Sequence, residues 1–156
     1  MLRVYLDSCV YNRPFDDYRR NERIFLEAMA FYAILHLVEK GGIEIVDSDA
    51  LRYENEQTAD AERKKRVTTY LNKASNMIVL SEANIERSRL LVNLGFKSLY
   101  ALHIAMAEQA SAQYFVTCDN DIIKKARAVG EELKTKICDV LEFVSEAIHV
   151  ENAEGN

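Results

Sequence analysis

Short apolar runs rich in β-branched and aromatic residues alternate with longer helical patterns along this chain of 156 residues. The runs typical of strands are residues 3–6, 43–46, 77–80, 114–117 and 136–138. Strands separated by helices predict βαβ units, and therefore an α/β fold with a parallel sheet and helices on both faces. In such sheets, ligands bind beyond the carboxyl ends of the strands.

Glycines and capping residues delimit the helical patterns between these strands. Helices are expected over residues 21–40, from Ser48 or Asp49 through 62–66, over 84–94 and 98–110, from the loop at 118–121 to 129, and over 139–148. Residues 12–17, which include the only proline, are expected to form a loop after the first strand. We expect residues 1–150 to form a single domain and residues 151–156 to form a frayed tail.

The composition fits a protein with a real core and excludes several classes of protein. Hydrophobic residues make up 49% of the chain and charged residues 29%, which argues against a disordered state. The 3 cysteines are too few for a disulfide framework and fit a reducing compartment. We expect no secretory signal at the start of the chain, since it has no long apolar segment there, and no apolar stretch reaches the roughly 20 residues of a membrane span. We therefore expect a cytoplasmic protein without membrane contact.

Two of the expected strands end in an aspartate. Residues 4–6 lead into Asp7, and residues 115–118 lead into Asp119. Because the carboxyl ends of parallel strands meet at one edge of a sheet, these carboxylates lie close together if the strands are neighbours. Two anions at close range need a cation or a proton between them, and Mg²⁺ prefers oxygen ligands. Each aspartate could instead cap the helix or turn after its strand, but for the matched pair we favour a metal site.

Further segments strengthen the pattern around these two aspartates. They are Tyr-Leu-Asp-Ser at 5–8 with Asn12, Ser-Asp-Ala-Leu-Arg-Tyr-Glu at 48–54, Ala-Leu-His-Ile-Ala-Met-Ala-Glu at 101–108, and Phe-Val-Thr-Cys-Asp-Asn-Asp at 115–121. Together and in this order they resemble the PIN-domain family, which includes the VapC-like toxins of bacterial and archaeal toxin–antitoxin pairs. The resemblance covers nearly the whole chain. It implies a three-layer α/β/α fold with a central parallel sheet.

The resemblance also implies an activity and its residues. PIN domains cleave RNA with metal-activated water in an acidic pocket that binds Mg²⁺ or Mn²⁺. Carried over to this chain, Asp7, Glu54 and Asp119 are the catalytic acids and the metal ligands, and Asp121 is a further acid that binds the metal. A metal ion bound in such a pocket can polarise a phosphoryl oxygen and activate a water molecule.

The supporting residues include one departure from the family pattern. Ser8 or Asn12 is the polar neighbour that would orient the first acid. The family commonly has Asp-Ala-Leu-His where this chain has Tyr100-Ala-Leu-His103. A neutral phenol is a poorer ligand for Mg²⁺ than a carboxylate, so Tyr100 weakens the site's attraction for a cation and could instead stack on a base. His103 could donate a proton or contact phosphate, and the alternative is an interior histidine hydrogen-bonded to the backbone.

The formal charge of −5 does not suit a general nucleic-acid coat, so contact with RNA needs a local basic patch or a metal ion. Lys124, Lys125 and Arg127 follow the acidic loop and are the residues that we expect to bind RNA. The basic group at residues 63–66 is the alternative, and it could also be a solvated helix face. The apolar helix at residues 21–40 would provide a surface for a homodimer or for an antitoxin protein, unless it is buried in the chain's own core.

The leading hypothesis is a Mg²⁺- or Mn²⁺-dependent endoribonuclease that cleaves RNA phosphodiesters and is the toxin of a toxin–antitoxin pair. The alternative is a catalytically degenerate PIN-like domain, in which Tyr100 replaces an acid, that serves as an RNA- or protein-binding module. A third hypothesis is a Mg²⁺-dependent phosphotransfer enzyme with a strand-end aspartate as its nucleophile. That chemistry normally needs a second aspartate two residues further on, where this chain has Cys9.

Overall fold

The computed structural model describes residues 1–19 and 21–155, with side chains through His149. The strands are β1 (Leu2–Leu6), β2 (Ile43–Ser48), β3 (Asn76–Ile78), β4 (Tyr114–Thr117) and β5 (Lys136–Asp139). The helices are α1 (Ser8–Asn12), α2 (Glu22–Glu39), α3 (Asp49–Glu56), α4 (Ala61–Leu71), α5 (Glu82–Asn93), α6 (Ser98–Gln109), α7 (Asn120–Val129) and α8 (Val140–Gly155). Short 3-10 turns η1 (Arg13–Phe15) and η2 (Gly130–Glu132) complete the described elements.

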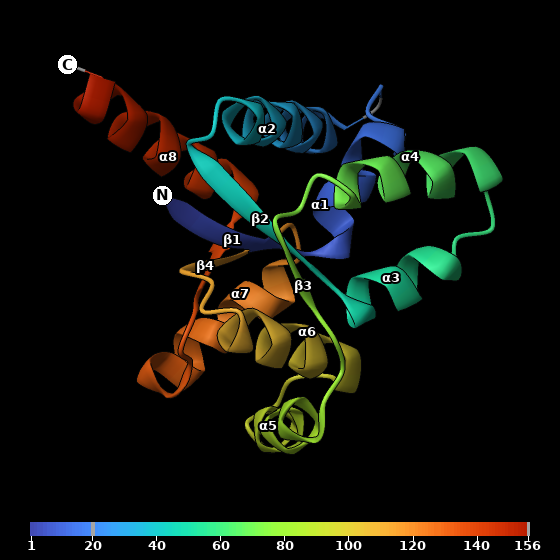
Figure 1. Cartoon of the computed structure of the whole chain (residues 1–156), viewed down its shortest axis with the longest axis vertical. Helices are drawn as coiled ribbons and strands as arrows, with labels where there is room; N and C mark the ends of the chain where they lie inside the picture. Colours follow the sequence, from blue (N-terminus) through green and yellow to red (C-terminus); the bar gives the residue numbers. More distant parts are fainter. Residues whose placement is uncertain (20, 156) are drawn as a thin grey trace.

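The strands form one parallel sheet in the order β3-β2-β1-β4-β5. Helices α2, α8, α1 and α4 lie on one side of it, and α5, α6 and α7 lie on the other (Figure 1). The chain therefore has the three-layer α/β/α fold with a central parallel sheet that the sequence predicts. Strands β1 and β4 are neighbours at the centre, which brings the two strand-end aspartates to the same edge of the sheet.

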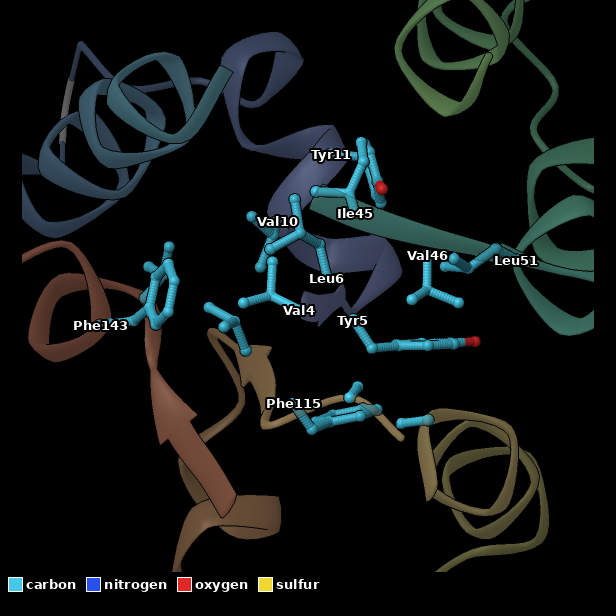
Figure 2. Packing of buried hydrophobic residues seen from close by; sticks show 14 of the residues in the cluster. Val4, Tyr5, Leu6, Val10, Tyr11, Ile45, Val46, Leu51, Phe115 and Phe143 are labelled. Atoms are coloured by element: carbon cyan, nitrogen blue, oxygen red, sulfur yellow. The ribbon is translucent and has the colours of Figure 1, made fainter. Parts of the chain in front are cut away.

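Alternation along β1 sends its side chains to the two faces of the sheet. Val4 and Leu6 face the side that also holds Val10, whereas the Tyr5 ring lies on the other side against Phe115 (Figure 2). The two rings are stacked with centroids 5.4 Å apart. Since Asp7 is two residues beyond Tyr5, its carboxylate points to the same side as this ring, which is the side covered by α6.

The segment after β1 differs from the expected loop. A one-turn helix, α1, starts directly after Asp7, whose side chain accepts a hydrogen bond from the Ser8 N–H, and η1 follows with Pro14 near its start. Proline is tolerated there because the first N–H groups of a helix have no partner within it. Such a short helix has too few residues to produce a periodic pattern, so the sequence offered no signal for it.

The helix expected from Ser48 or Asp49 through residues 62–66 is two helices, α3 and α4. Ser48 caps α3 through a hydrogen bond from the Leu51 N–H, as predicted. The chain then breaks at residues 57–60, and the Asp60 side chain accepts hydrogen bonds from the first turn of α4. Asparagine and aspartate favour such caps over helix interiors, which explains the break.

At the other end of the chain, the last helix continues to Gly155, although the sequence places its end at residue 148. Fraying of residues 151–156 remains a prediction, since side chains from residue 150 onward and the whole of residue 156 lie outside the described part. None of the described helices has the length and apolarity needed to cross a membrane.

Candidate metal centre

The pairing of β1 with β4 builds the floor of the site. Leu6 is in register with Val116, and the Asp7 N–H donates to the Val116 carbonyl over 2.9 Å. Asp7 and Thr117 therefore leave the sheet side by side. The Thr117 hydroxyl donates to Asp7 Oδ2 over 2.8 Å, and the Cys9 thiol donates to the same oxygen over 3.4 Å.

Asp7 is a buried acid with a perturbed proton affinity. Its side chain and backbone are only 2% exposed. Burial raises the pKa of the Asp7 carboxyl, and the negative charge of Glu54 raises it further, whereas His103 and the hydrogen bond from Thr117 act in the opposite direction. A carboxylate in this position is thus held at a cost that a bound cation would offset.

Glu54 and His103 reach Asp7 from two different helices. The ligand atoms of Asp7, Glu54 and His103 all lie within 4.8 Å of one another. Glu54 comes from the C-terminal half of α3 and is partly exposed, and His103 comes from the middle of α6 and is fully buried. His103 Nε2 is hydrogen-bonded to Glu54 Oε1. The predicted first and second acids therefore meet at one place.

A buried chain of hydrogen bonds extends from Glu54 into the protein. His103 Nδ1 lies 2.5 Å from the Tyr5 hydroxyl, which lies 2.6 Å from Ser48 Oγ. Ser48 Oγ already accepts from the Leu51 N–H over 3.1 Å. Every group is satisfied if Ser48 donates to Tyr5, Tyr5 donates to His103 Nδ1, and His103 donates from Nε2 to Glu54.

These hydrogen bonds determine the role of His103. Both of its ring nitrogens have partners, so it offers no free lone pair to a cation. It holds one oxygen of Glu54 and leaves the other to the site, which is the usual arrangement for a residue that orients a metal ligand. The expected hydrogen bond from His103 to the backbone is wrong, because its partners are the side chains of Tyr5 and Glu54.

Asp119 lies at the same sheet edge but outside the cluster of Asp7, Glu54 and His103. Its Oδ1 accepts from the N–H groups of Asp121 and Ile122, so it caps α7. Tyr100 lies near both aspartates: burial raises the pKa of its phenol, and the charges of Asp7 and Asp119 raise that pKa further. At the position of the expected acid, the chain thus places a neutral hydroxyl near Asp119.

The other predicted residues divide into those at the site and those beside it. Ser8 contacts Asp7 through its backbone N–H, whereas the Asn12 amide donates to the Ser8 carbonyl and not, in the described part of the chain, to the acid. Asp121 is exposed and lies in the wall of a neighbouring pocket. Thr117 completes the site, and sequence reasoning missed it because threonine at a strand end is common and carries no signal of its own.

The three residues expected to bind RNA all lie on α7 but line two different pockets. Lys124 and Lys125 line a pocket that also contains Asp119 and Tyr100. Arg127 lines a different pocket, together with Arg23 and Lys124. In the alternative basic group, Arg63 donates to Asp16 and to the Phe15 carbonyl, so part of that group holds the loop after α1 in place.

The residues at the edge of the sheet fit a hard divalent cation. Asp7 and the free oxygen of Glu54 are oxygen donors, and Asp119 lies nearby; Mg²⁺ and Mn²⁺ bind to a few carboxylates and keep several waters. The three cysteines are free thiols, two of them buried, and His103 is engaged. The donors at this edge therefore do not suit zinc, which prefers four sulfur and nitrogen ligands.

Among known proteins, this chain has matches in structure but none in sequence. No family model matches the chain, and no curated protein is similar to it in sequence. Among solved structures, the chain is similar to one in the crystal structure of VapBC2 from Rickettsia felis bound to a DNA fragment from their promoter, with a TM-score of 0.58 and 15% sequence identity. The similarity covers 88% of this chain and 98% of that chain. At this identity, the likeness shows the fold alone.

Proposed function

We propose that this chain is a divalent-metal-dependent endoribonuclease with a PIN-like domain over residues 1–150. The observation that carries the proposal is the meeting of Asp7 and Glu54, from two different elements, at the carboxyl edge of the sheet. Two carboxylates are brought together there, one of them buried, with hydrogen bonds that keep both in place. A bound Mg²⁺ or Mn²⁺ would polarise the phosphoryl oxygen of the substrate and lower the pKa of a water.

Each residue has a separate task in this proposal. Asp7 and Glu54 hold the cation, with Asp119 and Asp121 on the side from which the substrate enters. His103 is a positioning residue that orients Glu54 through Nε2. Tyr100 provides a neutral hydroxyl where the family commonly has an acid, so the cation is held by fewer carboxylates. Lys124 and Lys125 provide positive charge for the flanking strand.

The biological role that we propose is that of the toxin in a toxin–antitoxin pair. It is supported by the resemblance to VapC-like toxins and by the structural similarity to a chain of VapBC2. The outer face of α2 offers a docking surface, since Phe25, Leu26, Met29 and Tyr32 are exposed. We propose that an antitoxin or a second copy of the chain covers this face.

Cleavage of a labelled RNA pool tests the activity. The purified protein is compared in Mn²⁺ and in EDTA, with Asp7→Asn as the variant and Asp17→Asn, an exposed aspartate, as the matched control. We expect cleavage in Mn²⁺ that EDTA and Asp7→Asn abolish and that Asp17→Asn retains. Equal cleavage by Asp7→Asn would indicate a contaminating nuclease and refute the assignment.

The second candidate is a PIN-like module that binds RNA or protein without cleaving. Tyr100 favours it, because this phenol stands where the family commonly has an acid and burial keeps it neutral. Tyr100→Asp separates the candidates. If the natural chain is an enzyme, the variant changes an existing rate, whereas in a degenerate module it produces metal-dependent cleavage from none.

A further inference from the structure

A pocket of about 470 Å³ opens beside the acidic site, on the side of α7 and the start of α6. This volume falls in the range of roughly 300–1,000 Å³ that holds small organic ligands. Tyr100 and Asp119 line this pocket, and the negative charges of Asp7 and Asp119 both raise the pKa of the Tyr100 phenol. The pocket therefore lies at the same edge of the sheet as Asp7, with Tyr100 in its lining.

Three lysines also line this pocket. Lys97, at the start of α6, and Lys124 and Lys125, in α7, all line the pocket and are all exposed. Among the described residues, none of the three forms an ion pair with a carboxylate, even though Asp119 and Asp121 line the same pocket. In a chain with a net charge of −5, three amines against two carboxylates around one pocket give it a local excess of positive charge.

The backbone makes room for one of these amines. The Lys125 side chain runs across Gly95, and a Cβ on that glycine would lie 3.0 Å from Lys125 Cδ and 3.1 Å from Lys125 Nζ. Gly95 also has φ of +114°, a conformation that other residues rarely adopt. The glycine that separates α5 from α6 thus serves a second purpose, because it lets the Lys125 stem lie flat and its ammonium group reach the pocket.

We propose that this pocket binds one nucleotide of a single-stranded RNA, next to the phosphate that lies at the acidic cluster. The lysine amines contact the phosphate of that nucleotide, and the Tyr100 ring provides the surface on which its base stacks. The inference rests on the proposed function for the choice of RNA. A free anion suits the pocket less well, since Asp119 and Asp121 would repel it and only a tethered strand brings additional contacts.

Binding without cleavage tests this subsite independently of catalysis. The probe is a fluorescently labelled oligouridylate, its anisotropy is measured in EDTA at several salt concentrations, and inorganic phosphate is the competitor. The variants are Lys125→Ala and the double variant Lys124→Ala/Lys125→Ala. The matched control is Lys73→Ala, an exposed lysine after α4 that lies outside the pocket and outside both basic groups considered for RNA contact.

We expect Lys125→Ala to weaken RNA binding about tenfold and to reduce the slope of log K against log salt by about 0.7, the value for one phosphate contact with a single strand. The double variant reduces that slope by about 1.4. Tyr100→Phe keeps the ring and the affinity, whereas Tyr100→Ala loses several-fold. Lys73→Ala leaves both the affinity and the salt slope unchanged.

Two results would overturn the subsite. One is an affinity and a salt slope in the pocket-lysine variants equal to those of Lys73→Ala. The other is displacement of RNA by inorganic phosphate at an equal concentration of phosphate groups. Neither result depends on the nuclease assignment. Lysine-dependent binding by a chain that does not cleave would keep the subsite and refute the activity, and cleavage by a chain with unaltered lysine variants would do the reverse.

Discussion

The hydrogen-bond chain from Ser48 to Glu54 makes a strong prediction about two buried tyrosines. Tyr5 and Tyr11 are both fully buried. The hydroxyl of Tyr5 has two partners, Ser48 and His103, whereas the hydroxyl of Tyr11 has none among the described residues. The same chemical change, tyrosine to phenylalanine, should therefore have opposite effects at the two positions.

The magnitude follows from the groups left without a partner. Tyr5→Phe keeps the ring stacked on Phe115 but leaves the Ser48 hydroxyl and His103 Nδ1 unsatisfied in a dry interior. Each such group costs about 1–3 kcal/mol, so we expect a loss of about 3 kcal/mol in the free energy of unfolding. For a chain of this length, that corresponds to a fall in Tm of about 6–12 °C. Tyr11→Phe removes a buried hydroxyl that has no hydrogen bond, and it should be neutral or stabilising by about 1 kcal/mol.

Urea unfolding followed by circular dichroism, in EDTA so that metal does not contribute, measures both variants. The difference between the two variants is the quantity that matters, because it cancels the common loss of a hydroxyl. Two results would refute a continuous series of hydrogen bonds from Ser48 to Glu54. One is an equal change in the free energy of unfolding in Tyr5→Phe and Tyr11→Phe, and the other is a Tyr5→Phe variant as stable as the natural chain.

Other predictions concern charge and thiols. Because the pKa of Asp7 is raised in the fold, the ionised carboxylate of Asp7 destabilises the folded state increasingly as the pH rises through that pKa. In EDTA, Asp7→Asn should therefore be more stable than the natural chain at neutral pH and lose this advantage in acid. Urea unfolding at several pH values measures the difference. Glu27 is buried and lies 3.0 Å from Arg13 Nε and 3.5 Å from Arg23 Nε, so Glu27→Ala should cost about 2 kcal/mol in thermal unfolding; no loss would mean that the ion pairs do not stabilise the fold. Burial raises the pKa of the Cys138 thiol to about 12, and a thiol-specific reagent should label it at neutral pH only after unfolding.

The order of elements and the sheet edge could be predicted from sequence because both depend on local patterns. Apolar runs identify the strands, and a right-handed βαβ topology puts all their carboxyl ends at one edge. Reasoning from the residues alone therefore predicts that Asp7 and Asp119 lie at the same edge of the sheet. The resemblance to a known family added Glu54, which no periodicity singles out on a polar helix.

The hydrogen-bond chain could not be predicted, because its members are distant in sequence. Ser48 is 43 residues from Tyr5, and His103 is 98 residues from it. Their contact depends on the register of β1 against its neighbours and on the rotation of α6 over the sheet. For the same reason, the sequence did not predict that Lys97 lines one pocket with Lys124 and Lys125, since it lies at the start of a different helix and comes near them only in the folded chain.

Mn²⁺ binding by the purified chain, followed by electron paramagnetic resonance of the free ion, tests the central claim that Asp7 and Glu54 form a cation site. The natural chain and Asp17→Asn, which alters an exposed aspartate, should bind Mn²⁺ with the same affinity. Asp7→Asn should bind it at least about tenfold more weakly, because it loses a charged oxygen ligand. If Asp7→Asn binds Mn²⁺ as tightly as Asp17→Asn, the acids at the sheet edge do not form a metal site and the proposed mechanism is wrong.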